Sequence, residues 1–167
     1  MDQNNQNTIT VSEDLINNDL RSKVFSSPAG EYIEDYKVSF SQGYIYLDLK
    51  ARVKTLGALS AKYRVEIVGL IFKPGSHMLI ADYVEDVSSA GGLAQSMMLK
   101  AASLKGGTFL QMLVNMSNPP GIKADEKSCS IDLEKLLKLD KRLTDLLALE
   151  YVDCRNGQLR LSYRLSF

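Results

Sequence analysis

The only histidine of the chain, His77, is the one residue around which a nucleophile and base pair could be built. Such a pair needs a serine or cysteine within hydrogen-bond reach of the imidazole. Ser76 precedes it, but Gly75-Ser76-His77 follows a turn and begins a predicted strand, so the chain has no nucleophile elbow. We expect His77 to be a half-exposed residue at a strand end, and we expect no enzymatic activity.

Other residue types that could do chemistry are also scattered. Acidic residues gather in two groups, Glu34-Asp35 and the set Asp82, Glu85 and Asp86. A metal site needs more ligands at closer geometry, so we interpret both groups as solvated strand ends. The glycine pairs at 91–92 and 106–107 match neither P-loop nor dinucleotide spacing. Nothing in the sequence calls for a metal ion or a cofactor.

Two cysteines, Cys129 and Cys154, lie in predicted strands without a CxxC or Cys/His pattern. An exported protein could join them in a disulfide, whereas a cytosolic one would keep them reduced. We interpret them as half-buried small apolar side chains, and the sequence leaves a disulfide open.

Methionine is the residue type that indicates binding. Four of the six Met residues fall between residues 97 and 116. Met is flexible and suits surfaces that adapt to varied apolar partners, although a Met stripe is also typical of plain core. The residues that we predict to line a site for a greasy ligand are Met97, Met98, Ala101, Leu104, Phe109, Met112 and Leu113.

These residues belong to a stretch, 91–117, that predicts a long apolar helix. Its polar positions form one narrow stripe: Ser96, Lys100, Ser103, Gly107, Gln111 and Asn115. A helix with so wide an apolar arc must be largely enclosed. Gly106-Gly107 predicts a kink or a division, and Asn118-Pro119-Pro120-Gly121 ends the helix.

Strands with tight turns are predicted on both sides of this helix. Alternation is clearest at residues 45–54, and the other strands are expected at 31–40, 61–72, 77–87, 122–133, 149–154 and 159–167. Asn156-Gly157 is typical of a two-residue hairpin turn. Short helices are expected at 10–23, opened by the capping box Thr10-x-x-Glu13, and at 133–147, split near Asp140.

We therefore predict an α+β fold in which a long, highly curved antiparallel β-sheet wraps around one long, kinked apolar helix. A short N-terminal helix and a second helix near the C-terminus complete it. Residues 1–9 are expected to be disordered and residues 10–167 to form a single helix-in-sheet domain.

Composition narrows the classes of function. Lys plus Arg equals Asp plus Glu at 20 each, which removes the main electrostatic argument for a nucleic-acid partner. The longest apolar run is far shorter than the roughly 20 residues that cross a bilayer. No signal peptide follows Met1. We expect a cell-envelope location if a targeting segment has been removed from this polar start, and otherwise a cytoplasmic one.

Several stretches carry a resemblance to a known superfamily. They are Ser12-Glu13-Asp14-Leu15-Ile16-Asn17, Val38-x-Phe40-x-x-Gly43, the long apolar helix, Ile131-Asp132-Leu133-x-x-Leu136-Leu137, and Cys154-Arg155-Asn156-Gly157-Gln158-Leu159-x-Leu161. Over most of residues 10–167 the chain resembles small bacterial envelope proteins of the tubular lipid-binding (TULIP-like) superfamily. The resemblance implies a curved sheet around a long helix, non-enzymatic binding of lipid or another hydrophobic molecule, and residence at a membrane. It implies no specific ligand contacts, and the chain departs from it in showing no signal or anchor.

Three functions are consistent with these patterns. The first is binding of a lipid or apolar small molecule in a trough between sheet and helix, with peripheral membrane contact through the basic run Lys50, Arg52, Lys54, Lys62 and Arg64. The second is a structural or protein-interaction domain with a closed core and no ligand. The third, an acyl-thioester enzyme of the hot-dog type, ranks last because that fold places its helix before most of its strands. The oligomeric state stays open.

Overall fold

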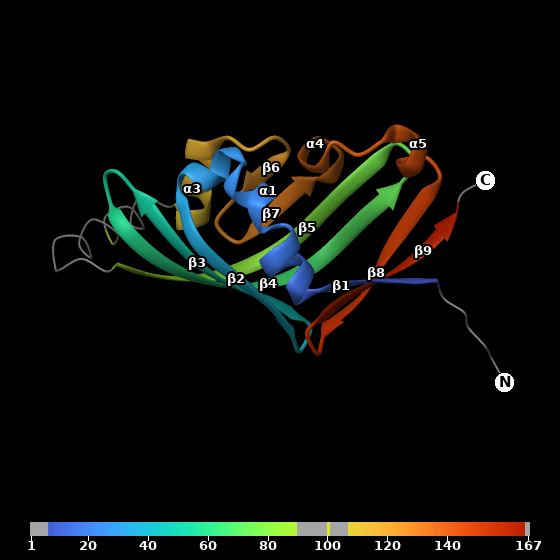
Figure 1. Ribbon diagram of the computed structural model, residues 1–167, viewed down its shortest axis with the longest axis horizontal. Helices are drawn as coiled ribbons and strands as arrows, with labels where there is room; N and C mark the ends of the chain where they lie inside the picture. Colours follow the sequence, from blue (N-terminus) through green and yellow to red (C-terminus); the bar gives the residue numbers. More distant parts are fainter. Residues whose placement is uncertain (1–6, 90–99, 101–106, 166–167) are drawn as a thin grey trace.

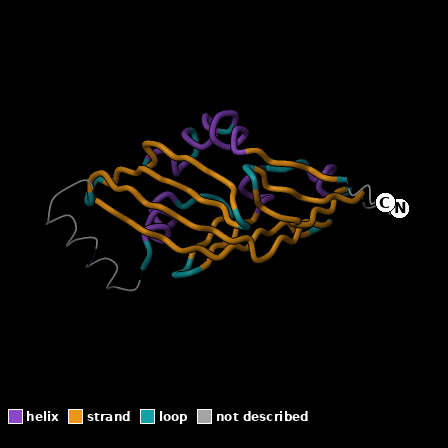
Figure 2. The backbone as a smooth tube through the Cα atoms, turned by 90° about the horizontal axis from the view of Figure 1, so that it is seen from below, coloured by secondary structure: helices purple, strands orange, loops and turns teal. Residues whose placement is uncertain are grey.

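Nine strands form one antiparallel sheet along the long axis of the molecule in the computed structural model, which describes residues 7–89, 100 and 107–165 (Figures 1 and 2). In chain order the strands are β1 (Thr8–Ser12), β2 (Ile33–Ser41), β3 (Tyr44–Val53), β4 (Gly57–Lys73), β5 (Ser76–Ser89), β6 (Ile122–Ala124), β7 (Ser128–Asp132), β8 (Leu147–Arg155) and β9 (Gln158–Leu165). The helical elements are the π-helix η1 (Leu15–Asp19), α1 (Arg21–Phe25), the 3₁₀-helix η2 (Pro28–Glu31), α3 (Phe109–Ser117), α4 (Leu133–Leu137) and α5 (Lys141–Thr144).

The sheet branches at β4, its longest strand. The first half of β4 pairs with β3, whereas Phe72 near its end pairs with Leu149 of β8. A bulge between Ile67 and Gly69 lies where the partner changes. Bulges bend a strand and increase its twist, so one long strand can serve both the β2-β3 hairpin and the β8-β9 hairpin.

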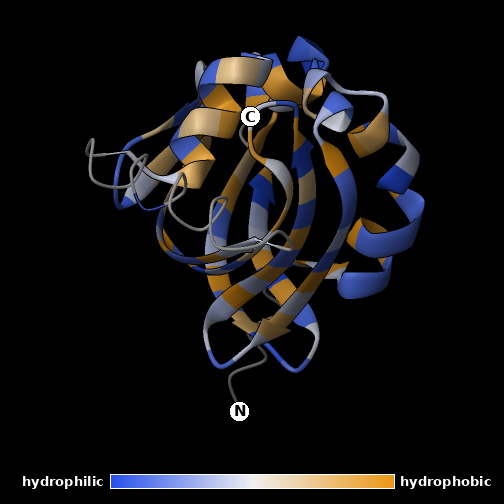
Figure 3. Ribbon diagram, turned by 90° about the vertical axis from the view of Figure 1, so that its left-hand side faces the viewer, coloured by the Kyte–Doolittle hydropathy of each residue, from blue (hydrophilic) through white to orange (hydrophobic). Residues whose placement is uncertain are grey.

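The turns of those two hairpins meet (Figure 1). Gly43 N donates to Cys154 O at 2.7 Å, and Gly157 N donates to Phe40 O at 2.9 Å. Both turns have two central residues with positive φ, which is the type I′ geometry predicted from Asn156-Gly157. Seen along the long axis, the strands curve around a common interior, with helices over it and along one flank (Figure 3).

The core lies on the inner face of the sheet. Its buried members are Tyr36, Val38, Phe40, Leu49, Ala51, Val53, Leu56, Leu59, Ala61, Tyr63, Tyr83, Phe109, Leu113 and Cys154. On β3 and β4 these residues alternate with exposed charged ones, so the period-2 pattern identified the correct inner face.

The predicted fold class is wrong in its central feature. Within 91–117 the structure describes Lys100, which is helical, and α3, which begins at Phe109 and runs for nine residues. Thr108 and Gln111 form a complete capping box there, which starts a new helix directly after the Gly106-Gly107 pair. A helix of this length covers part of one sheet face and cannot be an axis around which the sheet wraps. The rest of the predicted helix lies outside the described residues.

Of the two shorter helices, the first also differs from prediction. Thr10 lies in β1, where it pairs with Arg160, so it does not cap a helix. Ser12 takes that role, since its Oγ accepts the Leu15 N–H at 3.2 Å. In residues 133–147 the predicted split near Asp140 is confirmed: α4 ends at Lys138 in a left-handed backbone conformation, and Asp140 caps the start of α5.

Candidate functional site

The residues predicted to line a ligand trough divide into two sets. Phe109 and Leu113 are buried in the core, and Met112 is half-buried against it. Met97, Met98, Ala101 and Leu104 lie outside the described residues. Because the part of that stretch that the structure describes forms only the nine-residue helix α3, the trough does not have the form that we expected, and ligand contact by these residues stays a prediction.

A carboxylate on the inner face of β5 holds the start of α3. Glu85 Oε1 accepts the N–H of Phe109 at 2.7 Å, and Glu85 Oε2 accepts the N–H of Leu110 at 3.1 Å. Thr108 and Gln111 satisfy each other's backbone N–H groups at the same point. A negative charge at a helix N-terminus is favoured by the helix dipole as well as by these bonds. Glu85 is therefore a structural clamp and not the solvated residue that we predicted.

Two tyrosines lie beside this clamp. The hydroxyl of Tyr83 contacts Thr108 Oγ1 at 2.6 Å and donates to Asp125 O, and its ring is 6.1 Å from that of Tyr63. Burial, reinforced by the Glu85 carboxylate, raises the pKa of Tyr63, and burial likewise raises the pKa of Tyr83. The Tyr63 hydroxyl lies close to Glu85 without standard hydrogen-bond geometry. Both phenols stay protonated at neutral pH, so this cluster is suited to positioning α3 and not to acid–base catalysis.

His77 is buried, at 4% exposure, and is not the half-exposed residue that we predicted. Its Nδ1 lies 3.3 Å from Glu134 Oε2, and its ring meets that of Phe72 edge to face at 4.6 Å. Its Nε2 has no hydrogen-bond partner among the described residues. The side chains that the described residues bring against this imidazole by hydrogen bond or ring contact are Glu134 and Phe72, and neither is a serine or a cysteine.

The cysteines are free thiols. Burial raises the pKa of Cys154 to about 11, and its Sγ donates to Tyr44 O at 3.3 Å. Burial, with the nearby Asp125 and Asp82, also raises the pKa of Cys129. Thiols with a raised pKa are poor nucleophiles.

The outer face of β3, β4 and β5 carries two open depressions of about 480 and 280 Å³. Arg64 and Val84 line both of them. The Arg64 guanidinium lies over the Tyr44 ring at 4.9 Å, and Val84 is 59% exposed. Aromatic residues and arginine beside exposed apolar area are typical of protein interfaces.

The larger depression contains two carboxylates that face each other. Glu66 on β4 is directly opposite Asp82 on β5, and neither forms an ion pair with a described residue. Like charges in directly opposite positions destabilise a sheet.

Replacing Glu66 by Lys should therefore raise the free energy of unfolding by about 0.5–1 kcal/mol, because repulsion becomes attraction to Asp82. The matched control is Asp86→Lys, which should have the opposite sign because Asp86 is opposite Lys62. Urea denaturation in low salt measures both variants. In 1 M salt, where screening is strong, both effects should shrink. A Glu66→Lys variant no more stable than the parent would contradict this account.

A second exposed surface is formed by residues 137–146, which we call the leucine–lysine segment. Its leucines Leu137, Leu143 and Leu146 are 58, 68 and 49% exposed. Figure 1 shows α4 and α5, which carry this segment, on the same side of the sheet as α3. The sequence places these leucines on the amphipathic helix predicted at 133–147 and split near Asp140, whose apolar side we expect to be buried. The break at Lys138 turns them outward instead.

Basic side chains accompany these leucines. Lys138, Lys141 and Arg142 are exposed and form no ion pair with the residues that the structure describes. Within the same segment Asp140 caps α5 by accepting the Arg142 N–H at 2.9 Å, and Asp145 is exposed. Three cations against two carboxylates leave this apolar surface with a net positive charge.

The described residues contain no group of three or more side chains that could hold a metal ion. Their helices are also too short or too polar to cross a bilayer.

Comparison with known proteins gives no relative: no family model, no curated protein and no solved structure matches the chain.

Proposed function

We propose that the protein binds lipid without enzymatic activity, by placing the leucine–lysine segment in the surface of an anionic membrane. The observation that carries the proposal is the exposure of Leu137, Leu143 and Leu146 beside unpaired Lys138, Lys141 and Arg142. Apolar side chains at a membrane surface enter the acyl boundary while basic ones stay at the head groups. The contact thus uses the outside of the molecule and not an internal trough.

The expected affinity is modest. Full burial of a leucine gains about 1.5–3 kcal/mol, and part of each of these exposed side chains is already covered by the protein, so three of them supply about 3–4 kcal/mol. Each basic residue near an anionic surface adds about 1 kcal/mol, less the repulsion of Asp140 and Asp145. The sum corresponds to a dissociation constant between millimolar and micromolar. Binding should accordingly be reversible.

Flotation with phosphatidylcholine vesicles, with and without a fraction of phosphatidylglycerol, tests the proposal. The parent chain should bind the anionic vesicles, and added salt should weaken the binding. A Leu143→Ser, Leu146→Ser variant should lose about 30- to 100-fold in affinity, because it removes two of the three inserting side chains and with them about two thirds of their free energy.

Val152→Ser is the matched control, because Val152 is also an exposed apolar residue, at 42%, but lies on β8 outside the segment. It should bind vesicles as the parent does. If the parent chain fails to bind either type of vesicle, or if the control loses as much affinity as the double variant, the proposal is wrong.

A second candidate function, docking of a partner protein, is favoured by the outer face of β3, β4 and β5. There the Tyr44–Arg64 stack, exposed Val84 and the facing carboxylates Glu66 and Asp82 surround the two depressions. Such a surface fits a partner segment with basic and apolar side chains. If the parent chain does not bind vesicles, docking of a partner protein becomes the better-supported function.

A further inference from the structure

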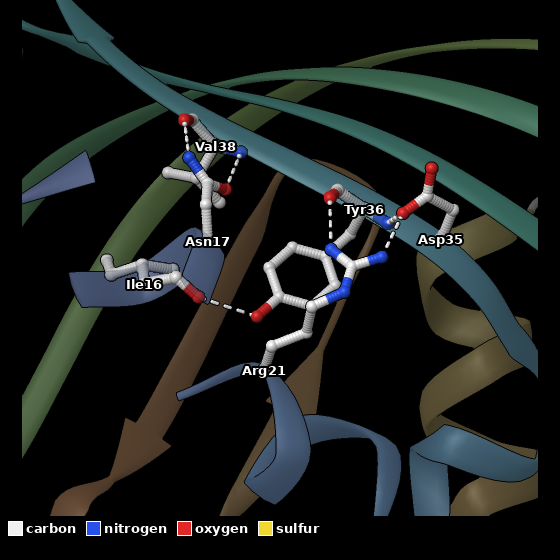
Figure 4. Close-up of polar contacts among 6 residues, drawn as sticks. All are labelled: Ile16, Asn17, Arg21, Asp35, Tyr36 and Val38. Carbon is white, nitrogen blue, oxygen red and sulfur yellow. Dashed lines mark hydrogen bonds and ion pairs between the residues drawn. The ribbon is translucent and has the colours of Figure 1, made fainter. Parts of the chain in front are cut away.

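Strand β2 is an edge strand: among the residues that the structure describes, it pairs with β3 alone. Its other side is covered by residues 13–25, which we call the cover segment (Figure 4). The bonds between them are Phe40 N to Glu13 Oε1 at 2.6 Å, Val38 N to Asn17 Oδ1 at 2.7 Å, Asn17 Nδ2 to Val38 O at 2.8 Å, and Arg21 Nη1 to Tyr36 O at 3.3 Å. Side chains thus occupy most of the backbone groups that a neighbouring strand would use. The exception is Phe40 O, which accepts the Gly157 N–H of the β8-β9 turn at 2.9 Å, so a docked strand would have to displace that bond as well.

The spacing of these bonds follows from helix and strand geometry. The three side chains, Glu13, Asn17 and Arg21, are four residues apart, which is about 6 Å along a helix. Their partners on β2 are two residues apart, which is about 6.6 Å along a strand. The two series run in opposite directions, so the cover segment imitates an antiparallel strand.

Two further contacts hold Arg21 and Tyr36 in this arrangement. Arg21 also pairs with Asp35, and its guanidinium lies 5.3 Å from the centre of the Tyr36 ring. The hydroxyl of Tyr36 donates to Ile16 O at 2.6 Å. The Arg21 guanidinium lowers the pKa of Asp35, which keeps this ion pair charged at neutral pH.

The apolar anchoring of the cover segment is weak by comparison. Neither η1 nor α1 contains a buried residue, and only Ile16, Val24 and Phe25 pack half-buried against the core. Residues 15–19 form a π-helix, an uncommon conformation that is frequent at functional sites. The segment is therefore held largely by polar bonds, and a docked strand would replace most of them one for one.

We propose that the edge of β2 is a docking site for β2 of a second copy of this chain, opened when the cover segment moves aside. A two-fold axis at Val38 would place Tyr36 opposite Phe40, and Lys37 opposite Ser39, in an isologous antiparallel pair. No like charges face each other in this register, since Asp35 meets Ser41. Edge-to-edge pairing is a common mode of recognition, and free edges are covered in many proteins for that reason. This interface does not depend on membrane contact.

The test is hydrogen exchange of the Val38 amide in an Asn17→Ala variant, measured over a range of protein concentrations. Asn17 is half-buried, so the variant should fold while leaving the Val38 N–H and C=O free. At low concentration this amide should exchange at least tenfold faster than in the parent. At high concentration the Val38 amide should become protected again, and light scattering should then show a dimer. Asn18→Ala, an exposed neighbour that bonds only Asp14, is the control and should behave as the parent does.

A second measurement uses a synthetic peptide of residues 33–41, which is the sequence of β2. Added to dilute Asn17→Ala protein, it should restore protection at Val38, and it should do so far less well with the parent. Exchange at Val38 that is fast at every concentration and indifferent to the peptide would overturn the proposal.

Discussion

Leu113→Asp is expected to unfold the protein at room temperature or to lower its melting temperature by more than 10 °C. Leu113 is 8% exposed and belongs to the buried cluster that includes Tyr63, Tyr83 and Phe109. Removing a buried leucine side chain costs about 2–5 kcal/mol, and an unpaired carboxylate in its place adds several more. A domain stable by about 5–15 kcal/mol has little left after that loss. Thermal unfolding followed by circular dichroism measures the effect.

The same helix provides the control. Met116 lies three residues further along α3 and is exposed, so Met116→Asp should cost less than about 1 kcal/mol. At this chain length 1 kcal/mol corresponds to a shift of about 2–4 °C. If Leu113→Asp melts within that range of the parent, α3 does not contribute to the core as the structure indicates.

The strands could be predicted because their signal is local. In β3 the inner residues Leu49, Ala51 and Val53 alternate with exposed Lys50 and Arg52, and one strand is enough to show it. The branching at β4 could not be predicted in the same way. The β2-β3 and β8-β9 hairpins pair with different parts of β4. Which part each hairpin pairs with depends on the bulge near Val68 and on contacts between distant turns.

The prediction of a long helix treated apolar periodicity over residues 91–117 as evidence for one unbroken helix. Apolar periodicity favours a helix on either side of Gly106-Gly107, but it does not say that the two sides are one helix. The better signal was Thr108-x-x-Gln111, a helix start directly after a glycine pair. In residues 133–147, by contrast, the break near Asp140 was predicted, and Asp140 is indeed the N-cap of α5. The exposure of the leucines was not predicted, because a broken helix cannot keep all of them on one face.

The special residues of β5 are those that break its alternation. Ala81 and Tyr83 face the core and Asp82 and Asp86 face outward, so the pattern requires an outward residue at 84 and an inward one at 85. Position 84 holds the exposed Val84, which lines the outer depressions. Position 85 holds the inward Glu85, which clamps α3. A polar residue in an apolar register therefore marks a buried interaction, and that signal was present in the sequence.

Glu85→Ala is expected to destabilise the protein by about 2–4 kcal/mol. The carboxylate accepts two N–H groups of the first turn of α3, and bonds to a charged acceptor contribute about 1.5–3 kcal/mol each, though not additively. The N-terminus of α3 would also lose its only described anion. Glu85→Gln keeps one neutral acceptor, so it should cost about half as much. Denaturant unfolding of the two variants gives these values.

A comparison between variants, and between the amides that exchange faster, tests the role of Glu85 in holding α3 better than the size of the stability loss does. Glu126→Ala removes an exposed carboxylate from the same region and should change stability by less than about 0.5 kcal/mol. In Glu85→Ala the amides of Phe109 and Leu110 should exchange fastest relative to the parent, while those of β3 and β4 stay protected. Equal stability of the Glu85 and Glu126 variants would mean that Thr108 and Gln111 suffice to start α3. In that case the free-energy cost of placing the Glu85 carboxylate on the apolar face of β5 would not be offset by the helix. The two hydrogen bonds from Glu85 to the first turn of α3 argue against that outcome.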